Sequence, residues 1–234
     1  MGKKNFYRAG VWLGIFVVGT LLLRTVDVRC IGETGRAVGL ATVNGWFHQL
    51  TGVHRRLYVI TDWLGLVPIF VCAVFGCVGL RQWMQRKRLW KVDRELRLLG
   101  VYYVLVIVCY LVFEKLPVNY RPVLIEGRLE ASYPSSTTLL VLSVMPTLAF
   151  EIKRRVKKKS LQKLLCMAAG IFSAGMVLGR LVSGVHWLTD IIGAVALSRG
   201  LFCLFKGFAL WKNGGEVRRW SWEKSCRNCE KARS

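Results

Sequence analysis

Long apolar stretches alternate with shorter polar segments along the chain. The six stretches cover residues 9–23, 57–80, 98–113, 137–150, 164–184 and 187–205. A helix needs about 20 mostly apolar residues to cross the hydrocarbon core of a bilayer, and aromatic or long basic side chains at the ends of a shorter stretch extend it to the interfaces. The pattern therefore predicts an all-α, polytopic membrane protein built as a bundle of six transmembrane helices.

The composition agrees with this prediction and excludes two other classes of protein. Apolar residues make up 53% of the chain, while 35 Lys and Arg against 13 Asp and Glu give a net charge of +22. A disordered basic protein lacks that apolar content, and a soluble globular enzyme rarely combines it with so high a charge. The charges are therefore expected in the segments between the helices.

The distribution of Lys and Arg between the predicted helices indicates the topology. With the N-terminus inside the cell, the inner segments hold 25 of these residues and the outer segments nine. Because positive charge accumulates on the cytoplasmic side, both termini of this multi-pass cell-membrane protein are predicted to be cytoplasmic. Topology and anionic lipid then account for the basic runs 86–88 and 153–159, and no nucleic-acid partner is predicted.

The expected organisation is one membrane domain, residues 1–210, followed by a basic cytoplasmic tail, residues 211–234, that rests on the inner leaflet. The first apolar stretch lacks the small residues of a signal-peptide cleavage site and is expected to remain as the first helix. Residues 38–48 interleave apolar and polar side chains, which predicts a short amphipathic helix along the outer interface.

Glycine spacing gives a prediction about helix packing. Gly10 and Gly14 in the first stretch, and Gly175 and Gly179 in the fifth, are pairs of small residues four positions apart. Such pairs allow the backbones of two membrane helices to approach closely. Both pairs are therefore predicted to lie at helix contacts.

Three cations lie where the outer ends of the helices are predicted, although outer segments are otherwise poor in Lys and Arg. Lys115 and Arg121 follow the third stretch, and Arg180 lies near the end of the fifth. Ionisable groups at the ends of or inside membrane helices usually serve a function, and cations favour an anionic ligand. An anionic ligand is therefore expected at this face.

His186 and Asp190 lie four residues apart at the start of the sixth stretch. Helical periodicity predicts that both share one helix face, with the carboxylate on one imidazole nitrogen and the other nitrogen directed outward. A histidine held in this way acts as a nucleophile or base. Asp62, below Arg55 and Arg56 in the second stretch, is interpreted as structural.

These residues together resemble the type 2 phosphatidic acid phosphatase (PAP2) family, which shares a helical core with the vanadium haloperoxidases. The family carries Lys followed by Arg-Pro, then Pro-Ser-Gly-His, then Ser-Arg with a downstream His and Asp. The corresponding residues here are Lys115 with Arg121-Pro122, then Pro134-Ser135-Ser136-Thr137, then Gly179-Arg180 with His186 and Asp190. The motifs span residues 115–190 of the predicted membrane domain.

The resemblance implies a role for each of these positions. Lys115, Arg121, Ser135 and Arg180 would bind phosphate, with Ser136 and Thr137 as secondary positions. His186 would attack phosphorus to form a phosphohistidine, and Asp190 would orient it. The implied activity is hydrolysis of a lipid phosphate or prenyl diphosphate at the outer face of the membrane.

Neither a metal nor a cofactor is predicted, since the implied chemistry requires none. Cys226 and Cys229 in the tail form a single Cys-x-x-Cys pair. A zinc site needs a second pair of ligands, and no histidine follows to supply it. The oligomeric state and the role of these two cysteines are not indicated by the sequence.

Three positions depart from the family pattern. Five residues separate Lys115 from Arg121 where the family has six, and Gly179 replaces the Ser before Arg180. Thr137 stands where the family has its general-acid histidine, and a threonine hydroxyl cannot act as an acid at neutral pH. The last departure removes a group that contributes to the rate of hydrolysis.

Several explanations of the Thr137 departure are open. A diphosphate needs little protonation of its leaving group, so the protein would prefer lipid diphosphates to monoesters. Alternatively His48 or His54, both in the first outer segment, supplies the proton. The remaining alternatives are a non-catalytic lipid-phosphate-binding protein and a lipid phosphotransferase with an acceptor other than water.

Overall fold

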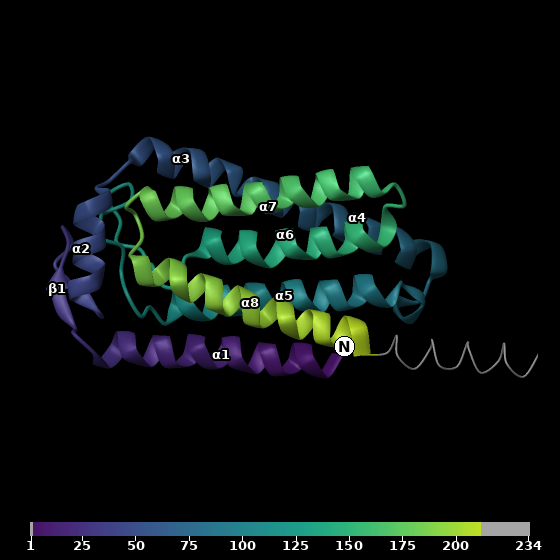
Figure 1. The fold of residues 1–234 in the computed structure, drawn as a ribbon, viewed down its shortest axis with the longest axis horizontal. Coiled ribbons are helices and arrows are strands. Elements are labelled where there is room, and N and C mark those ends of the chain that lie inside the picture. Colours follow the sequence, from purple (N-terminus) through teal and green to yellow (C-terminus); the bar gives the residue numbers. More distant parts are fainter. Residues whose placement is uncertain (1, 212–234) are drawn as a thin grey trace, which may run out of the picture.

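The computed structural model describes residues 2–211, and this part of the chain folds into a bundle of long helices (Figure 1). The helices are α1 (Gly2–Thr25), α3 (Arg55–Leu64), α4 (Leu66–Arg86), α5 (Arg94–Lys115), α6 (Ser136–Arg155), α7 (Lys159–Val182) and α8 (Leu188–Trp211). Six candidate membrane spans result, because α3 and α4 count as one span. The predicted six-helix membrane bundle is confirmed. The predicted tail lies outside the described residues beyond Trp211.

The helices extend past the apolar stretches from which they were predicted. Helix α1 begins at Gly2 rather than at residue 9, and α7 begins at Lys159 rather than at residue 164. The added turns contain basic residues, which favour helical structure and reach water at a membrane interface. The apolar pattern therefore predicted the positions of the spans correctly but underestimated the lengths of the helices.

One end of the bundle carries short elements, labelled α2 and β1 in Figure 1. Strands β1 (Arg29–Ile31) and β2 (Arg36–Val38) form an antiparallel hairpin in which Cys30 lies opposite Ala37. Helix α2 (Ala41–Thr51) overlaps the predicted amphipathic helix at 38–48. The hairpin was not predicted, because its three-residue strands are too short for a period-two pattern. At the opposite end, a 3₁₀ turn (Leu89–Lys91) joins α4 to α5.

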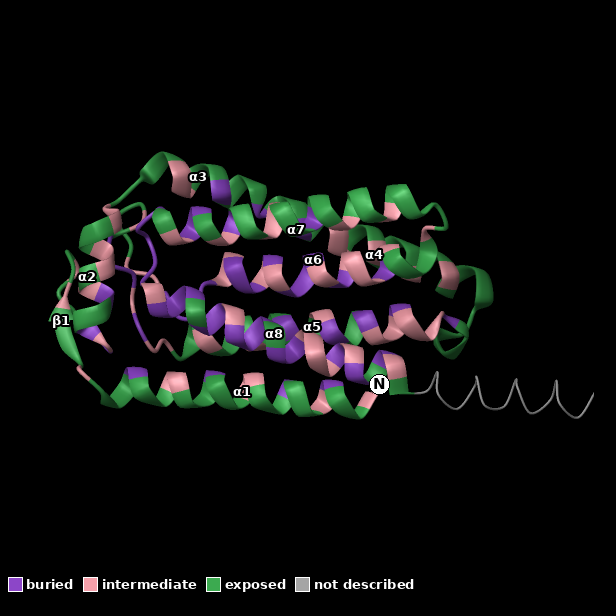
Figure 2. Cartoon of the chain, viewed as in Figure 1, coloured by how far each residue is buried: buried purple, intermediate pink, exposed green. Residues whose placement is uncertain are grey.

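Helices α6 and α8 form the interior of the bundle (Figure 2). In their apolar segments 50% and 61% of the residues are buried, against 17–22% in the other spans. The outward faces of the surrounding helices expose large apolar side chains such as Phe70, Val101 and Ile171. Exposed apolar faces around a buried core are typical of a bundle in contact with lipid.

The closest helix packing involves three glycines of α8 spaced seven residues apart, Gly193, Gly200 and Gly207. A Cβ atom on Gly200 would lie 2.7 Å from Leu13, and one on Gly207 would lie 2.8 Å from Phe6. Seven residues make about two helical turns, so the glycines share one face. Gly200 and Gly207 let α8 approach α1, whereas Gly193 lies against the ring of Tyr133.

The predicted glycine pairs are not at this interface. A Cβ atom on Gly10, Gly14 or Gly175 would meet no atom within 4 Å, so the prediction is wrong for these three residues. Gly179 alone lies at a close contact, 2.7 Å from the Thr61 methyl group when a Cβ is added. Spacing by four residues occurs by chance among the many glycines of membrane helices, and only the burial of each face distinguishes the cases.

Candidate active site

The predicted site residues come from loops and helix ends at the α2 end of the bundle. The loop 116–135 between α5 and α6 folds back on itself through an antiparallel bridge between Tyr120 and Ala131. The Ser135 N–H donates to the Asp190 carbonyl at 3.2 Å, which joins the start of α6 to the start of α8. Segments distant in the sequence therefore meet at the two helix N-termini, where the helix dipoles favour a negative charge.

His186 and Asp190 are adjacent, but not for the predicted reason. His186 lies in the bend before α8, and only Asp190 is helical. The Asp190 Oδ2 atom accepts from the backbone N–H of Trp187 at 2.9 Å, as the third residue of a helix does in a capping box. The same oxygen lies 3.6 Å from His186 Nδ1. The shared helix face is wrong, while the predicted pairing of carboxylate and imidazole is present.

Asn44 of α2 holds the start of α8 from the other side. Its side-chain amide donates to Gly39 O and to Thr189 Oγ1, and its carbonyl oxygen accepts from the Thr189 N–H at 3.2 Å. Asn44 is fully buried. These bonds fix the helix turn that presents His186 and Asp190.

Arg121 and Arg180 lie against the same aromatic ring. The guanidinium carbons are 5.8 Å and 4.9 Å from the centre of the Tyr58 ring of α3. Both arginines are almost completely buried, with side-chain exposures of 8% and 1%. Stacking on an aromatic face partly compensates the desolvation of a guanidinium. Tyr58 therefore keeps two cations together in the interior of the bundle end.

Each arginine also contacts a carboxylate at the rim. Arg121 Nη2 lies 3.1 Å from Glu130 Oε2, and Arg180 Nη1 lies 3.5 Å from Asp62 Oδ1. Both acidic side chains are more exposed than their partners, at 38% and 57%. Asp62, interpreted from the sequence as structural, thus pairs with Arg180 of α7.

Several polar atoms of this cluster have no hydrogen-bond partner in the described part of the chain. They are Nε and Nη1 of Arg121, Nε of Arg180 and both ring nitrogens of His186, all buried. The backbone of Ser132 lies close to the His186 ring without a hydrogen bond of ordinary geometry. Buried donors are normally satisfied, so donors that remain free at one place indicate a binding site for an acceptor such as phosphate.

Electrostatics keep His186 neutral. Its complete burial lowers the pKa well below the ordinary value of 6.5, and the positive charges of Arg121 and Arg180 lower it further. Because both arginines act on the same imidazole through their charges, the three side chains are near one another. A neutral imidazole has a free nitrogen lone pair, as a nucleophile requires.

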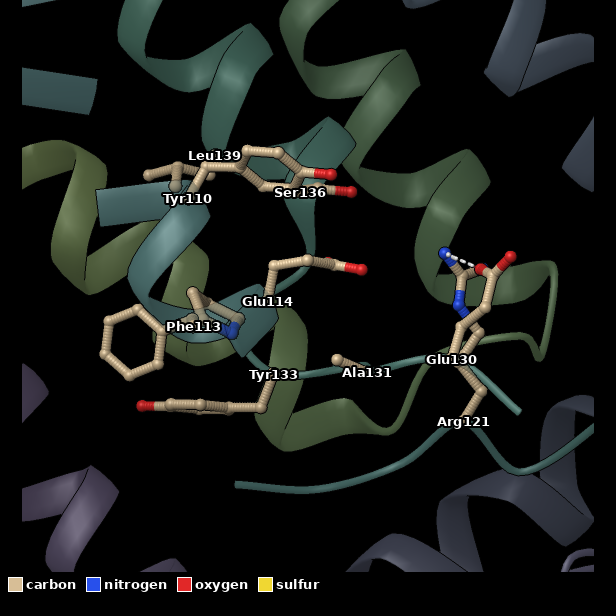
Figure 3. A pocket seen from close by; sticks show the side chains of 10 residues that line it. Tyr110, Phe113, Glu114, Arg121, Glu130, Ala131, Tyr133, Ser136 and Leu139 are labelled. Carbon is tan, nitrogen blue, oxygen red and sulfur yellow. Dashed lines mark ion pairs between the residues drawn. The ribbon is translucent and has the colours of Figure 1, made fainter. Parts of the chain in front are cut away.

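A cavity of about 160 Å³ opens beside Arg121 (Figure 3). Its charged lining residues are Arg121, Glu114 and Glu130, and Ser136 contributes a hydroxyl. A second, mainly apolar cavity of about 380 Å³ lies between α4, α5 and α6 and shares Tyr110, Ser136 and Leu139 with the first. A polar cavity that adjoins an apolar one fits an amphiphilic ligand.

Part of the chain is similar in sequence to known proteins. A sequence model of the PAP2 superfamily matches residues 106–213. This segment of the chain therefore resembles the PAP2 superfamily. Phosphatidylglycerophosphatase B of Bacillus subtilis (strain 168) is 28% identical over 96 residues, which cover 41% of this chain and 46% of that protein. The chain thus matches less than half the length of this relative.

A solved structure shares the fold of most of the bundle. The crystal structure of a transmembrane PAP2-type phosphatidylglycerolphosphate phosphatase from Bacillus subtilis matches 87% of this chain and 96% of that chain, with a TM-score of 0.60. The sequence identity is 18%, so this match concerns the fold alone. It extends the PAP2 likeness to most of the six-helix bundle.

The Pro-Ser-Ser-Thr stretch, residues 134–137, lies at the start of α6. Ser135 is fully buried and its hydroxyl donates to Thr138, whereas Ser136 lines the cavity beside Arg121. Thr137 lines only the apolar cavity, and its methyl group lies close to Gly65 of the α3–α4 junction. The position of the PAP2 general acid therefore does not line the Arg121 cavity here.

Lys115 is separate from the other predicted phosphate-binding residues. It is the last residue of α5, is exposed and does not line the Arg121 cavity, whereas the preceding Glu114 does. One residue along a helix is a rotation of about 100°. The five-residue spacing between Lys115 and Arg121 thus places Glu114, with six residues between it and Arg121, at the spacing that the PAP2 lysine has.

The two histidines considered as substitute acids lie elsewhere at this end of the bundle. His48 packs against Trp187 with ring centres 5.4 Å apart, and burial lowers its pKa. His54 Nε2 lies 3.0 Å from the carbonyl of Thr51. Neither lines the Arg121 cavity. Within residues 2–211 no three His, Cys, Asp or Glu side chains are grouped to hold a metal ion.

Sequence reasoning missed three residues of the site, Tyr58, Glu114 and Glu130. The Tyr58 ring is one of several aromatic residues in membrane helices, and nothing in the spacing connects it to Arg121 or Arg180. Glu114 and Glu130 carry the charge opposite to that expected beside a phosphate. Only Glu114 had a signal in the sequence, because six residues separate it from Arg121.

Proposed function

We propose that this protein is a membrane lipid phosphatase that hydrolyses a lipid phosphate or diphosphate through a phosphohistidine intermediate on His186. One observation carries the proposal: the free, buried N–H groups of Arg121 and Arg180 and the unbonded imidazole of His186 converge at two helix N-termini. A dianionic phosphate accepts from such donors, and phosphoryl transfer depends mainly on positioning and charge neutralisation.

His186 Nε2 is the attacking atom in this mechanism. Asp190 Oδ2 faces Nδ1, so a proton held on Nδ1 leaves the lone pair on Nε2. As the bond from Nε2 to phosphorus forms, the imidazole becomes positive and the buried carboxylate stabilises it. Water then attacks the phosphohistidine, which releases inorganic phosphate and restores the neutral imidazole.

Arg121 and Arg180 bind the transferred phosphoryl group. Each is paired with one carboxylate, Glu130 or Asp62, that a phosphate dianion would displace. The carboxylates carry one negative charge each and are partly solvated, whereas the bound phosphate carries two and accepts from several donors. Glu130 and Asp62 therefore hold the two guanidinium groups in place until the substrate binds.

The apolar cavity between α4, α5 and α6 supports a lipid substrate. It adjoins the Arg121 cavity, so a lipid chain there would leave its phosphate beside the arginines. The relatives are phosphatidylglycerophosphate phosphatases by name, which makes this lipid the first substrate to test. Phosphatidate and a prenyl diphosphate extend the test to other leaving groups.

The active site is proposed to face the outer side of the cell membrane, with both termini in the cytoplasm. The end of the bundle opposite His186 carries the basic residues at the end of α4 and on both sides of the α6–α7 connection. Positive charge of this density is typical of the cytoplasmic side. Accessibility labelling of Cys30, at the His186 end, from outside intact cells would test this orientation.

Phosphate release by the detergent-purified full-length protein tests the function. Release from at least one of the three lipids is expected, with a loss of about 10³-fold or more in His186→Ala. A His186→Ala protein that still binds lipid phosphate shows that the loss is chemical. Lipid binding without release by the wild type would favour the non-catalytic binding protein, and transfer to an added alcohol acceptor in place of water would favour the phosphotransferase.

A further inference from the structure

The proposed mechanism lacks a proton donor for the leaving group. When phosphate leaves a lipid alcohol, the alkoxide oxygen must be protonated, and a positioned acid contributes typically about 10²- to 10⁴-fold to the rate. Thr137 has no acidic proton at neutral pH and lies on the apolar cavity, near Gly65. A side chain that lines the Arg121 cavity must therefore supply the proton if monoesters are hydrolysed.

Glu114 is placed for this role. It belongs to the last turn of α5, and Figure 3 shows its side chain reaching into the cavity toward the pair formed by Arg121 and Glu130. It forms no ion pair with another described residue, whereas Glu130 is 3.1 Å from Arg121. A carboxyl group without a cationic partner is free to change its protonation state during a reaction.

Arg121 connects this carboxyl group to the reacting phosphate. The guanidinium lines the Glu114 cavity and also acts on the His186 imidazole through its charge. A phosphate bound by Arg121 would thus have His186 on one side and the Glu114 cavity on another. The nucleophile and the leaving group lie on opposite sides of phosphorus in an in-line displacement.

The other groups that line the cavity are poor proton donors. The titratable and charged residues facing Glu114 are Tyr110, Arg121, Glu130 and Tyr133. Burial raises the pKa of Tyr133 to about 12, and its hydroxyl is engaged with Thr20. Glu130 is held in an ion pair with Arg121, and the Ser136 hydroxyl is no more acidic than that of Thr137.

We infer that Glu114 is the general acid of this phosphatase, in place of the PAP2 histidine. The inference rests on the proposed function. As His186 Nε2 bonds to phosphorus and the bond to the lipid oxygen breaks, the Glu114 carboxyl gives its proton to that oxygen. In the second step the Glu114 carboxylate takes a proton from the attacking water, and inorganic phosphate leaves His186.

The leaving group decides how much the reaction depends on this acid. The alkoxide released from phosphatidate is a strong base, whereas the phosphate ester released from a prenyl diphosphate is a weak one. The substitution Glu114→Gln keeps the size of the side chain and removes the acid. We expect kcat on phosphatidate to fall about 10²- to 10⁴-fold and kcat on a prenyl diphosphate to fall less than about tenfold.

Controls separate this inference from the proposed function and from misfolding. His186→Ala should lose both substrates, whereas Glu126→Gln, the same change on an exposed residue of the loop 116–135, should retain both. Glu114→Asp, which keeps the carboxyl but withdraws it, should also lose more activity on phosphatidate than on the diphosphate. An equal loss on both substrates in both Glu114 variants, or an undiminished rate on phosphatidate, would overturn the role of Glu114. Inactivity of the wild type on every lipid would overturn the proposed function with it.

Discussion

The two ends of the bundle use arginine differently. At the end near Glu151, Arg86 and Arg155 pair with Asp93 and Glu151 while 42% and 44% of their own side-chain surface stays exposed. At the His186 end, Arg121 and Arg180 are buried at 8% and 1% exposure. The first arrangement, which links α4 to the start of α5 through Arg86 and Asp93 and pairs Arg155 with Glu151 one turn apart within α6, has a low cost because water still solvates the cations. The second arrangement removes two cations from water.

The difference in burial indicates where the ligand binds. Burying a guanidinium with unsatisfied N–H groups is costly, and the fold can retain it only if stacking, nearby carboxylates or a bound anion compensates. Tyr58, Glu130 and Asp62 supply the first two kinds of compensation, and free donors remain. Under the proposed function, a bound phosphate would supply the third. Stability dominates the choice of residues at one end, and function dominates it at the other.

Alanine substitution of one arginine from each end gives the largest expected contrast. Arg180→Ala should lower kcat/KM on the best lipid substrate about 10²- to 10³-fold, the usual effect of removing one group that stabilises transition-state charge. Arg155→Ala should leave kcat/KM nearly unchanged but lower the free energy of unfolding by about 1–3 kcal/mol, because Glu151 stays buried without its partner.

Steady-state kinetics and thermal unfolding in the same detergent measure both quantities. A comparable loss of activity in both variants would contradict the difference between the two ends. Loss of folding in Arg180→Ala would be recognised from the unfolding curve, and Arg180→Lys, which keeps the charge but not the planar donor group, would then carry the kinetic comparison.

Helix packing away from both ends gives the next effect. Gly200→Ala places a methyl group 2.7 Å from Leu13 and should destabilise the protein by about 1–3 kcal/mol. Gly14→Ala is the matched change on α1, where nothing lies within 4 Å, and should leave the thermal midpoint unchanged or raise it slightly. Equal midpoints for the two variants would show that the α8 glycines do not determine the approach of α1.

The pH dependence of stability reports on the buried imidazole. His186 has a pKa far below 6.5 in the folded protein and regains its ordinary value on unfolding, so the unfolded state binds the extra proton. Stability contributed in this way is complete above the ordinary pKa and is lost as the pH falls below it. At about pH 5 the loss is at most about 2 kcal/mol.

Thermal unfolding at about pH 7.5 and about pH 5 measures the loss of stability that protonation of His186 causes. The midpoint of the wild type should fall further than that of His186→Gln, which has no group to titrate at this position. A variant that loses as much stability as the wild type would show that other groups cause the acid sensitivity.

Lys115 gives the smallest expected effect. Because it is exposed and does not line the Arg121 cavity, Lys115→Met should change kcat/KM less than about threefold at physiological salt, where exposed charges are screened. A loss as large as that of Arg180→Ala would return Lys115 to the phosphate site and remove the reason for assigning that helix position to Glu114.

The sequence allowed the fold to be predicted because apolar length and the distribution of Lys and Arg are properties of single segments. Six spans, the helix near residue 41 and the family all follow from such local patterns. Helix α6 begins at Ser136, next to the predicted start of its apolar stretch at residue 137. The packing of α1 on α8 did not follow, because it depends on which glycines face another helix.

The site was only partly accessible to the same reasoning. His186 and Asp190 are close in sequence, and their pairing in the fold agrees with the spacing, although Trp187 and the cap of α8 produce it. Tyr58, Asp62 and Glu130 contact the two arginines across the bundle, and no sequence spacing encodes such contacts. The roles of all the predicted site residues remain predictions: Lys115, Arg121, Ser135, Ser136, Thr137, Arg180, His186 and Asp190.

Trapping the phosphohistidine on His186 tests the proposed mechanism directly. The purified protein is mixed with phosphatidate, phosphatidylglycerophosphate or a prenyl diphosphate carrying a radiolabelled terminal phosphate, and the reaction is stopped within its first turnover in denaturing alkali. If His186 carries the phosphoryl group, the protein should carry label that is stable to alkali and is released by acid. The label should be absent from His186→Ala. Release of inorganic phosphate at the full rate with no label on the protein at any time, or label that persists in His186→Ala, would contradict the proposed mechanism.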